Sequence, residues 1–489
     1  MTARAELRRL VNGVLLPGFI GTEPPSWLAR AAADGLAGVA YFGHNVVDRA
    51  QVSELSNALH ALGDGFLVAS DEEGGDVTRL EARQGSSYPG NAALGRLDDT
   101  PTTAAVARCI ARDARLAGID IVLAPTADVS SNPDNPVIGV RSFGRDTELV
   151  ARHTGAFVTG LQNAGVAGCA KHFPGHGDTA VDSHVGLPVI EADLATLRRR
   201  DLPPFAAAIE AGVRCVLTAH IRFPSLDHRP ATLSPVVLGL LRDELAFDGV
   251  IITDALDMHA VSRTVGMGPG AVEALSAGAD LLCISNPRDD EAEFELVCSA
   301  VIDAVLEGSL ARRRVEEARE RVRALAAWVC EARSTPLPDP EPDVGLEVAR
   351  RALSVTGSVR LRGTPHVLDI RTHVNQAAGR HGPRLHEELV RRAPATTSSK
   401  VRSDGRDEAA STIVAQAQTT SRPVVVLVDE PHRDPAQAAL LAAVTSARPD
   451  VVVVSSGWPD ERSALGDNVV VMFGAGRVNA QAAAEVLLG

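Results

Sequence analysis

The chain of 489 residues is too long for a single hydrophobic core, and the usual size of a domain predicts two domains. Apolar residues make up 45% of the chain and charged residues 22%, which is the balance of an ordinary globular protein and excludes extensive disorder. The formal net charge of −14 disfavours a surface that neutralises phosphate backbones or anionic lipid, so we expect no nucleic acid and no membrane as partner.

The cysteines and the N-terminus indicate the compartment. The six cysteines form no C-x-x-C pair, and several lie in apolar runs, so we expect buried, reduced thiols. The N-terminal stretch MTARAELRRLVNGVLLPGFIG resembles a leader peptide, but glycine and proline interrupt its apolar part, which fits a first strand better. No apolar run reaches membrane-spanning length. We therefore expect a cytoplasmic protein, although an exported chain from which the leader has been removed shows the same sequence features.

Short apolar runs recur eight times between residues 13 and 285 and predict a barrel. The runs are VLLPGF, GVAYF, FLVASD, IDIVLAP, GCAKHF, CVLTAH, GVIITD and DLLCIS. The intervals carry helical patterns; in TELVARHTGAFVTGLQNAG, for example, Val150, Phe157 and Leu161 recur at helical spacing. Eight strands that are apolar on both faces and alternate with helices predict an α/β fold, the (β/α)8 or TIM barrel. An open doubly wound sheet is the second choice, because no glycine-rich phosphate loop follows the first strand.

Polar side chains gather at or just after the C-terminal ends of these runs. They are Asp71, Asp128, Lys171, His172, His220 and Asp254. Taken singly, each of them is equally well explained as a capped or paired strand end. Active sites of barrels are built at this end of the strands, so the whole pattern predicts an enzyme.

A proline-rich acidic stretch divides the chain in two. STPLPDPEPDVG, from Ser334 to Gly345, cannot continue a helix and is typical of a semi-rigid linker. Four strand-like runs follow it, HVLDI, PVVVLVDE, DVVVVSSG and NVVVMFG, between alanine-rich helical segments. We predict a catalytic barrel over residues 1–335, a linker over 336–345 and a smaller α/β sandwich over 346–489. Within the sandwich, SSKVRSDGRD, from Ser398 to Asp407, is expected to be an exposed loop.

The sequence favours neither a bound nucleotide nor a metal. GAGRVNAQAA follows the last apolar run and resembles a dinucleotide fingerprint, but its third glycine is absent and it ends the chain rather than opening a βαβ unit. The stretch KHFPGHGDTAVDSH holds His172, His176 and His184, whose spacing fits no common zinc pattern. Pro174 also breaks the helix that ligation by the first two histidines would need. We therefore predict no cofactor and no metal.

The last residues of this stretch are better suited to proton transfer. A loop whose polar side chains bond to its own backbone explains His176, but it explains the end of the stretch less well. Asp182 precedes His184 by two residues and can orient the imidazole and raise its basicity. Its candidate partner is Asp254 at the end of the seventh run, whereas Asp257 lies beyond that run and fits a helix cap. A carboxylate nucleophile with a separate proton donor is what retaining glycoside cleavage requires.

Four segments resemble the signature segments of glycoside hydrolase family 3, in its β-N-acetylglucosaminidase branch: SDEEGGDVTRL, NPVIGVRSFGRD, KHFPGHGDTAVDSH and IITDALDM. The resemblance implies a TIM barrel and an α/β sandwich over nearly the whole chain. It implies Asp254 as nucleophile, His184 as acid/base and Asp182 as the partner that polarises this histidine. It also implies that the sugar is bound by Asp71, Arg79, Arg141, Lys171 and His172.

The activity that this resemblance implies is exo-acting and retaining, on terminal β-linked N-acetylglucosamine of a muropeptide or a chito-oligosaccharide, as in cell-wall recycling. Two alternatives stay open. An imidazole in the acid/base position does not repel an anion, so inorganic phosphate can replace water and make the enzyme a phosphorylase. The other alternative is a non-catalytic barrel that binds or senses sugars, against which the set Asp182, His184 and Asp254 argues, because a binding module needs no nucleophile.

Overall fold

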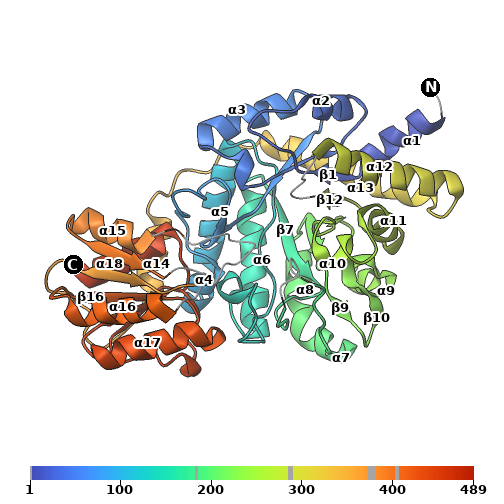
Figure 1. Cartoon of the computed structure of the whole chain (residues 1–489). Helices are drawn as coiled ribbons and strands as arrows, with labels where there is room; N and C mark the ends of the chain where they lie inside the picture. Colours follow the sequence, from blue (N-terminus) through green and yellow to red (C-terminus); the bar gives the residue numbers. More distant parts are fainter. Residues whose placement is uncertain (1–2, 182–185, 285–289, 373–381, 383, 402–406) are drawn as a thin grey trace. The chain divides into compact units, whose positions relative to one another are not determined.

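The computed structural model describes the chain except for residues 1–2, 182–185, 285–289, 373–381, 383 and 402–406 (Figure 1). The chain forms two compact units, which we call the barrel unit and the sheet unit. The barrel unit comprises Met1–Glu73, Thr100–Asn132 and Arg145–Glu341. The sheet unit comprises Gly74–Asp99, Pro133–Gly144 and Pro342–Gly489. The single boundary at residues 336–345 stays a prediction.

The barrel unit is built on eight parallel strands that coincide with the eight apolar runs. They are β1 (Leu15–Pro17), β2 (Gly38–Tyr41), β3 (Leu67–Ser70), β6 (Ile121–Val122), β7 (Ala167–Phe173), β8 (Cys215–Thr218), β11 (Val250–Ile252) and β12 (Leu282–Ile284). Six of them follow the order β11-β8-β7-β6-β3-β2, and β1 pairs with β12. A parallel bridge between Ile252 and Leu281 links these two groups, and β1 packs beside β2. The sheet therefore curls into a barrel, which confirms the predicted fold.

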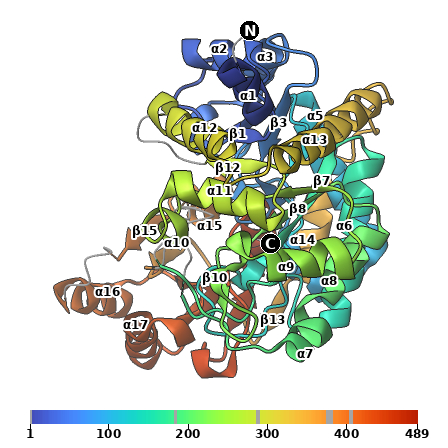
Figure 2. The ribbon, with the colours of Figure 1, turned by 90° about the vertical axis from the view of Figure 1, so that its right-hand side faces the viewer.

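Helices cover the outside of the barrel, as Figure 1 and Figure 2 show for α6 and α8 beside β7. They are α1 (Ala3–Asn12), α2 (Ser26–Ala33), α3 (Arg49–His60), α5 (Thr100–Leu116), α6 (Thr147–Asn163), α7 (Leu194–Thr196), α8 (Pro203–Glu210), α9 (Pro235–Gly239), α10 (His259–Ser262), α11 (Met267–Ala277), α12 (Asp290–Glu307) and α13 (Arg312–Arg333). Short strand pairs lie in two loops, β4 (Glu72–Gly74) with β5 (Val77–Thr78) and β9 (Arg222–Phe223) with β10 (Asp227–Pro230). No helix among the described residues is long and apolar enough to span a membrane.

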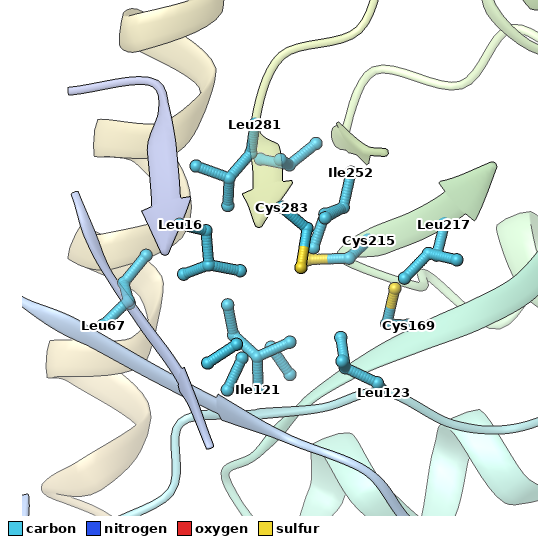
Figure 3. Packing of buried hydrophobic residues seen from close by; sticks show 14 of the residues in the cluster. Leu16, Leu67, Ile121, Leu123, Cys169, Cys215, Leu217, Ile252, Leu281 and Cys283 are labelled. Carbon is cyan, nitrogen blue, oxygen red and sulfur yellow. The ribbon is translucent and has the colours of Figure 1, made fainter. Parts of the chain in front are cut away.

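Inward-facing apolar side chains of the strands fill the barrel. Leu16, Leu67, Ile121, Cys169 and Ile252 belong to this buried cluster (Figure 3). Alternate residues of a strand point to the same face, so a fully apolar strand supplies one side chain to this core and the next to the helices. The clustering explains why each run is apolar on both faces.

The cysteines are buried as expected, with one exception. Cys169, Cys215 and Cys283 lie inside the barrel, and Cys109 and Cys298 are buried elsewhere. The expectation is wrong for Cys330, which is exposed. The reason is helical geometry: the core-facing residues of α13 on either side of it leave this position on the solvent side.

The sheet unit is an α/β sandwich, as predicted. Its sheet has the order β13-β18-β17-β16-β14-β15 and is parallel except for β13. The strands are β13 (Ser354–Thr356), β14 (His366–Asp369), β15 (Thr397–Lys400), β16 (Val424–Val428), β17 (Val452–Ser455) and β18 (Val469–Val471). The helices are α4 (Asn91–Leu97), α14 (Val344–Ala352), α15 (Arg384–Arg392), α16 (Asp407–Thr419), α17 (Pro435–Ala447) and α18 (Arg477–Leu488). Separate apolar clusters on the two faces of the sheet form its two cores.

Strand β15 corrects the expectation of an exposed loop from Ser398 onward. It pairs with β14 through residues 397–400 and has no second neighbour among the described strands of the sheet. Three of its four residues are exposed. An edge strand packs few side chains, so its sequence, TSSK, carries no apolar signal.

A buried carboxylate ties the last strands of the barrel to its outer helices. Asp280, in the turn before β12, is fully buried and accepts a hydrogen bond from the backbone N of Ile251 at 3.1 Å. Arg242, Arg314 and Arg321 place guanidinium nitrogens 2.6, 2.5 and 3.3 Å from its carboxylate oxygens. Arg242 lies in the segment after α9, whereas Arg314 and Arg321 both lie on α13, so this single anion joins that segment, α13 and β11.

We predict that Asp280→Ala lowers the free energy of unfolding of the barrel by about 3 kcal/mol, because it leaves three arginines without their common partner. Urea denaturation followed by far-UV circular dichroism measures the loss. Glu316→Ala is the matched control, since it removes an exposed helical pair with Arg312, which does not contact Asp280. Equal stability of the wild type and the Asp280 variant would contradict this account.

Candidate active site

The polar side chains noted in the sequence meet at the carboxyl ends of the barrel strands. Asp71 follows β3, Lys171 and His172 lie within β7, and Asp254 follows β11 by two residues. Each of these strands is parallel to its neighbours, so their C-terminal ends share one side of the barrel. The predicted gathering of polar groups at this end is therefore present in the structure.

Lys171 lies between two carboxylates. Its Nζ is 2.6 Å from Asp71 Oδ1 and 2.6 Å from Glu73 Oε1. The lysine and glutamate side chains are each 3% exposed, whereas the Asp71 side chain is 16% exposed. Glu73 also accepts a hydrogen bond from Thr126 Oγ1 at 3.2 Å. Two anions around one cation leave a net negative charge, and the more accessible carboxylate can accept hydrogen bonds from a ligand.

Glu73 is a residue that the sequence argument missed. The signal was present, because SDEEGG places three acids in a row after a strand, but only Asp71 was selected. The structure separates them: Ser70 Oγ donates to Glu72 Oε1 at 3.3 Å, and Glu73 joins the lysine. A sequence pattern does not show which of three adjacent acids reaches a partner 98 residues away.

Asp128 anchors His172, which lies within β7, and His176, which follows this strand. It is fully buried and accepts hydrogen bonds from His172 Nδ1 at 2.7 Å, from His172 N at 3.2 Å and from His176 N at 2.6 Å. Burial alone raises the pKa of Asp128, but the charge and hydrogen bond of His172 outweigh it and hold the pKa below its usual value. The aspartate therefore fixes the orientation of the His172 ring through Nδ1 and leaves Nε2 as its other polar atom.

His176 packs inside the loop that follows β7. It is buried, and its Nδ1 lies 3.1 Å from Thr179 Oγ1. Burial, followed by the charge of His172, lowers the pKa of His176 from 6.5 to about 4. The imidazole is therefore neutral near pH 7. This environment agrees with the structural role expected for His176.

Asp254 is half-buried at the end of β11. Its backbone N donates to Thr218 Oγ1 at 3.4 Å, and its Oδ1 accepts from Ala255 N at 2.8 Å. The carboxylate charge also acts on the pKa of His176, which places the two groups in the same electrostatic neighbourhood. A half-buried carboxylate at a barrel mouth is accessible to a small substrate.

His220 holds the backbone next to Asp254. It is fully buried, with Nε2 2.9 Å from the carbonyl oxygen of Ala255 and Nδ1 2.8 Å from Thr232 Oγ1. A carbonyl oxygen only accepts hydrogen bonds, so Nε2 carries a proton. The sequence pointed to His220 as a polar strand end, and the structure gives it a positioning contact with the turn after β11.

The remaining predicted site residues lie either in the sheet unit or outside the described residues. Arg79 and Arg141 belong to the sheet unit, where Arg141 is buried and its Nη1 donates to the carbonyl oxygen of Val137 at 3.3 Å. Asp182 and His184 lie outside the described residues. Of the predicted site residues, Asp71 and Lys171 are in direct contact in the structure.

A parallel barrel with buried ion pairs and an accessible carboxylate at its C-terminal end has the organisation of a barrel enzyme. The family model described as "Glycosyl hydrolase family 3 N terminal domain" matches residues 24–325. The chain therefore belongs to glycoside hydrolase family 3 and is a glycoside hydrolase, as the sequence motifs predicted.

Relatives extend this result. A beta-hexosaminidase A of Pseudoalteromonas piscicida is 36% identical over 332 residues, covering 62% of this chain and 55% of the relative. A beta-hexosaminidase of Stenotrophomonas maltophilia is 36% identical over 314 residues, covering 61% of this chain and 91% of the relative. The solved glycoside hydrolase family 3 β-N-acetylglucosaminidase from Paenibacillus sp. str. FPU-7 superposes with a TM-score of 0.88 at 32% identity, covering 100% of this chain and 96% of that structure.

The lowered pKa of His176 predicts a pH dependence of stability. Between pH 6.5 and about 4 the unfolded chain binds a proton that the folded chain does not, so stability rises with pH across this window and is complete above it. The free energy of unfolding of the wild type should fall between pH 7 and pH 4. In His176→Gln we expect this fall to be smaller by up to about 3 kcal/mol.

Urea denaturation at a series of pH values measures this slope. Exposed His228→Gln is the control and should leave the slope unchanged. An identical acid-side slope in the wild type and the His176 variant would contradict the assignment.

Proposed function

We propose that the chain is a retaining, exo-acting β-N-acetylglucosaminidase that releases terminal β-linked N-acetylglucosamine through a covalent glycosyl-aspartate intermediate. The observation that carries the proposal is the half-buried Asp254 carboxylate at the end of β11, on the side of the barrel where Lys171 and Asp71 form their ion pair. The relatives named as hexosaminidases and the superposed β-N-acetylglucosaminidase support the substrate class.

In the first step, an Asp254 oxygen attacks the anomeric carbon while the bond from that carbon to the leaving oxygen breaks. His184 donates its proton to the leaving oxygen, and Asp182 stabilises the imidazolium before the transfer. The sugar is now esterified to Asp254 with inverted configuration. Splitting the displacement into two steps lowers the barrier of each.

In the second step, neutral His184 takes a proton from water, whose oxygen attacks the anomeric carbon. The bond to Asp254 breaks and the carboxylate is regenerated. Two inversions give net retention, so the product is the β-anomer.

We propose that the sugar is bound by the five residues that the family resemblance indicates: Asp71, Arg79, Arg141, Lys171 and His172. Lys171 is held by Asp71 and Glu73, and His172 by Asp128, so both side chains are oriented before a ligand arrives. Preorganised donors and acceptors suit the hydroxyl groups of a sugar, whose hydrogen bonds strengthen as the ring distorts. We propose a muropeptide or chito-oligosaccharide as the source of the sugar, acted on in the cytoplasm.

The nucleophile assignment predicts a loss of turnover. Asp254→Asn keeps the size of the side chain but removes its nucleophilic charge, so we expect kcat on 4-nitrophenyl N-acetyl-β-D-glucosaminide to fall by on the order of 10³ or more. Asp257→Asn is the matched control, because Asp257 is also half-buried and lies three residues further along. Retained activity of the Asp254 variant together with loss in the Asp257 variant would overturn the assignment.

The same assay identifies the acceptor. We expect the wild type to release β-N-acetylglucosamine at a rate that inorganic phosphate does not change, as followed by NMR. Formation of the 1-phosphate, faster as phosphate rises, would instead establish a phosphorylase. Absence of either product would remove the hexosaminidase assignment.

A further inference from the structure

Side chains of the C-terminal sheet hold the segment 133–144, which carries Arg141 and which we call the Arg141 segment. Trp458 Nε1 donates to the carbonyl oxygen of Gly139 at 3.0 Å. Arg433 Nη1 donates to the carbonyl oxygen of Asn135 at 2.5 Å. His432 Nε2 lies 3.0 Å from the carbonyl oxygen of Pro133. All of these residues belong to the sheet unit, although more than 290 positions separate the donors from the acceptors.

Backbone hydrogen bonds within the Arg141 segment are short-range. Its hydrogen bonds include those from Arg141 N to Ile138 O at 2.8 Å and from Ser142 N to Gly139 O at 3.2 Å. These bonds close single turns and do not fix the direction of the segment. The three contacts from the sheet act at the first and third residues of the segment and at the residue two before Arg141, so they help to fix its direction.

The three donors are themselves held in place. The Trp458 ring meets Phe473 edge-on, with centroids 5.6 Å apart and planes at 78°. His432 Nδ1 lies 3.0 Å from Ser463 Oγ. Arg433 forms an ion pair with Glu430 at 2.5 Å. Donors with fixed orientations lose little side-chain entropy when they bind the segment, so they are suited to preorganise it.

Arg141 lines a cavity together with residues that follow β16 and β17. A cavity of about 40 Å³ is lined by Arg141 together with Asp429, Glu430 and Arg433. The carbonyl oxygen of Arg141 accepts a hydrogen bond from buried Asn91 Nδ2 at 2.7 Å, which fixes its backbone from the other side. The position of this guanidinium therefore depends on the loops that follow β16 and β17.

We propose that Trp458, Arg433 and His432 are positioning residues for Arg141, and that the C-terminal sheet takes part in sugar binding through them. The inference rests on the proposed function, in which Arg141 binds the sugar. A guanidinium that binds hydroxyl or amide oxygens needs a fixed direction, and an error of an ångström in its position costs rate. In this proposal the sheet unit helps to position a sugar-binding side chain but supplies no atom that reacts.

Trp458→Phe tests the proposal, because it removes the indole donor and keeps an aromatic ring beside Phe473. We expect kcat/KM on 4-nitrophenyl N-acetyl-β-D-glucosaminide to fall about five- to ten-fold, the effect of one lost hydrogen bond. In an Arg141→Ala background the same substitution should change kcat/KM by less than about two-fold, because its effect passes through Arg141. A substitution that only weakens the fold has the same effect in both backgrounds.

Trp27→Phe is the matched control. Trp27 also packs against a phenylalanine, with centroids 5.1 Å apart, and its Nε1 has no hydrogen-bond partner among the described residues. Amide hydrogen exchange of residues 137–142 follows the contact without substrate, and we expect it to become faster in the Trp458 variant and to stay unchanged in the Trp27 variant. Arg433→Met, which removes the donor to Asn135, is the second variant and should behave like Trp458→Phe.

The outcomes separate the two proposals. If the wild type turns over the hexosaminide, two results overturn the inference. One is an equal effect of Trp458→Phe on kcat/KM with and without Arg141, and the other is unchanged amide exchange of residues 137–142. A wild type that turns over no hexosaminide overturns the proposed function. In that case, unchanged amide exchange of residues 137–142 in Trp458→Phe and Arg433→Met would show in addition that the sheet contacts do not hold the Arg141 segment.

Discussion

Parallel strands bring their carboxyl ends to one side of the barrel, and this constraint decides where charge lies in the barrel unit. The inner faces of the strands are apolar, so an ionisable group on a strand is stabilised only where the strand ends and a partner from a neighbouring strand is near. Lys171 illustrates the consequence: it is almost fully buried within β7, and the carboxylates of Asp71 and Glu73 beside β3 compensate its charge. Removing both anions would leave this lysine as an uncompensated buried charge, whereas one remaining carboxylate still neutralises it.

The same constraint orders the histidines. Asp128 is fully buried and stays ionised because His172 and the backbone of His176 satisfy it. In return it fixes one ring nitrogen of His172 and the start of the loop that leads to His184. Buried His176 is neutral near pH 7 and so adds no positive charge beside His172. Burial and pairing thus set the charge at the barrel mouth before any ligand binds.

Much of the fold could be predicted from the sequence, because each barrel strand lies in a short apolar run and several of these runs end in polar residues. In the sheet unit the strands that escaped prediction are β13 and β15, polar edge strands with one neighbour each among the described strands, so neither burial nor periodicity marks them. The short strands β4, β5, β9 and β10 escaped as well. The site was predictable where chemistry is local: Asp71, Lys171 and His172 lie at strand ends. Glu73 was missed because its partner is distant in sequence.

The assignment of residues to units shows a second limit of sequence patterns. Segments 74–99 and 133–144 lie between barrel strands in the chain, yet they belong to the sheet unit. Contacts such as that from Trp458 to Gly139 join positions 319 residues apart, and no local pattern encodes them. Arg79 and Arg141 are consequently placed by a part of the chain whose role the sequence left open.

The central claim is that Asp254 becomes covalently linked to the sugar during turnover. The most direct measurement is peptide mass spectrometry after incubation with a 5-fluoro glycosyl fluoride of N-acetylglucosamine, which slows hydrolysis of the intermediate. We expect the mass of one fluorinated sugar on the peptide that contains Asp254, and no label in Asp254→Asn. Label on another carboxylate, with Asp254 unmodified in an enzyme that is inactivated, would contradict the account.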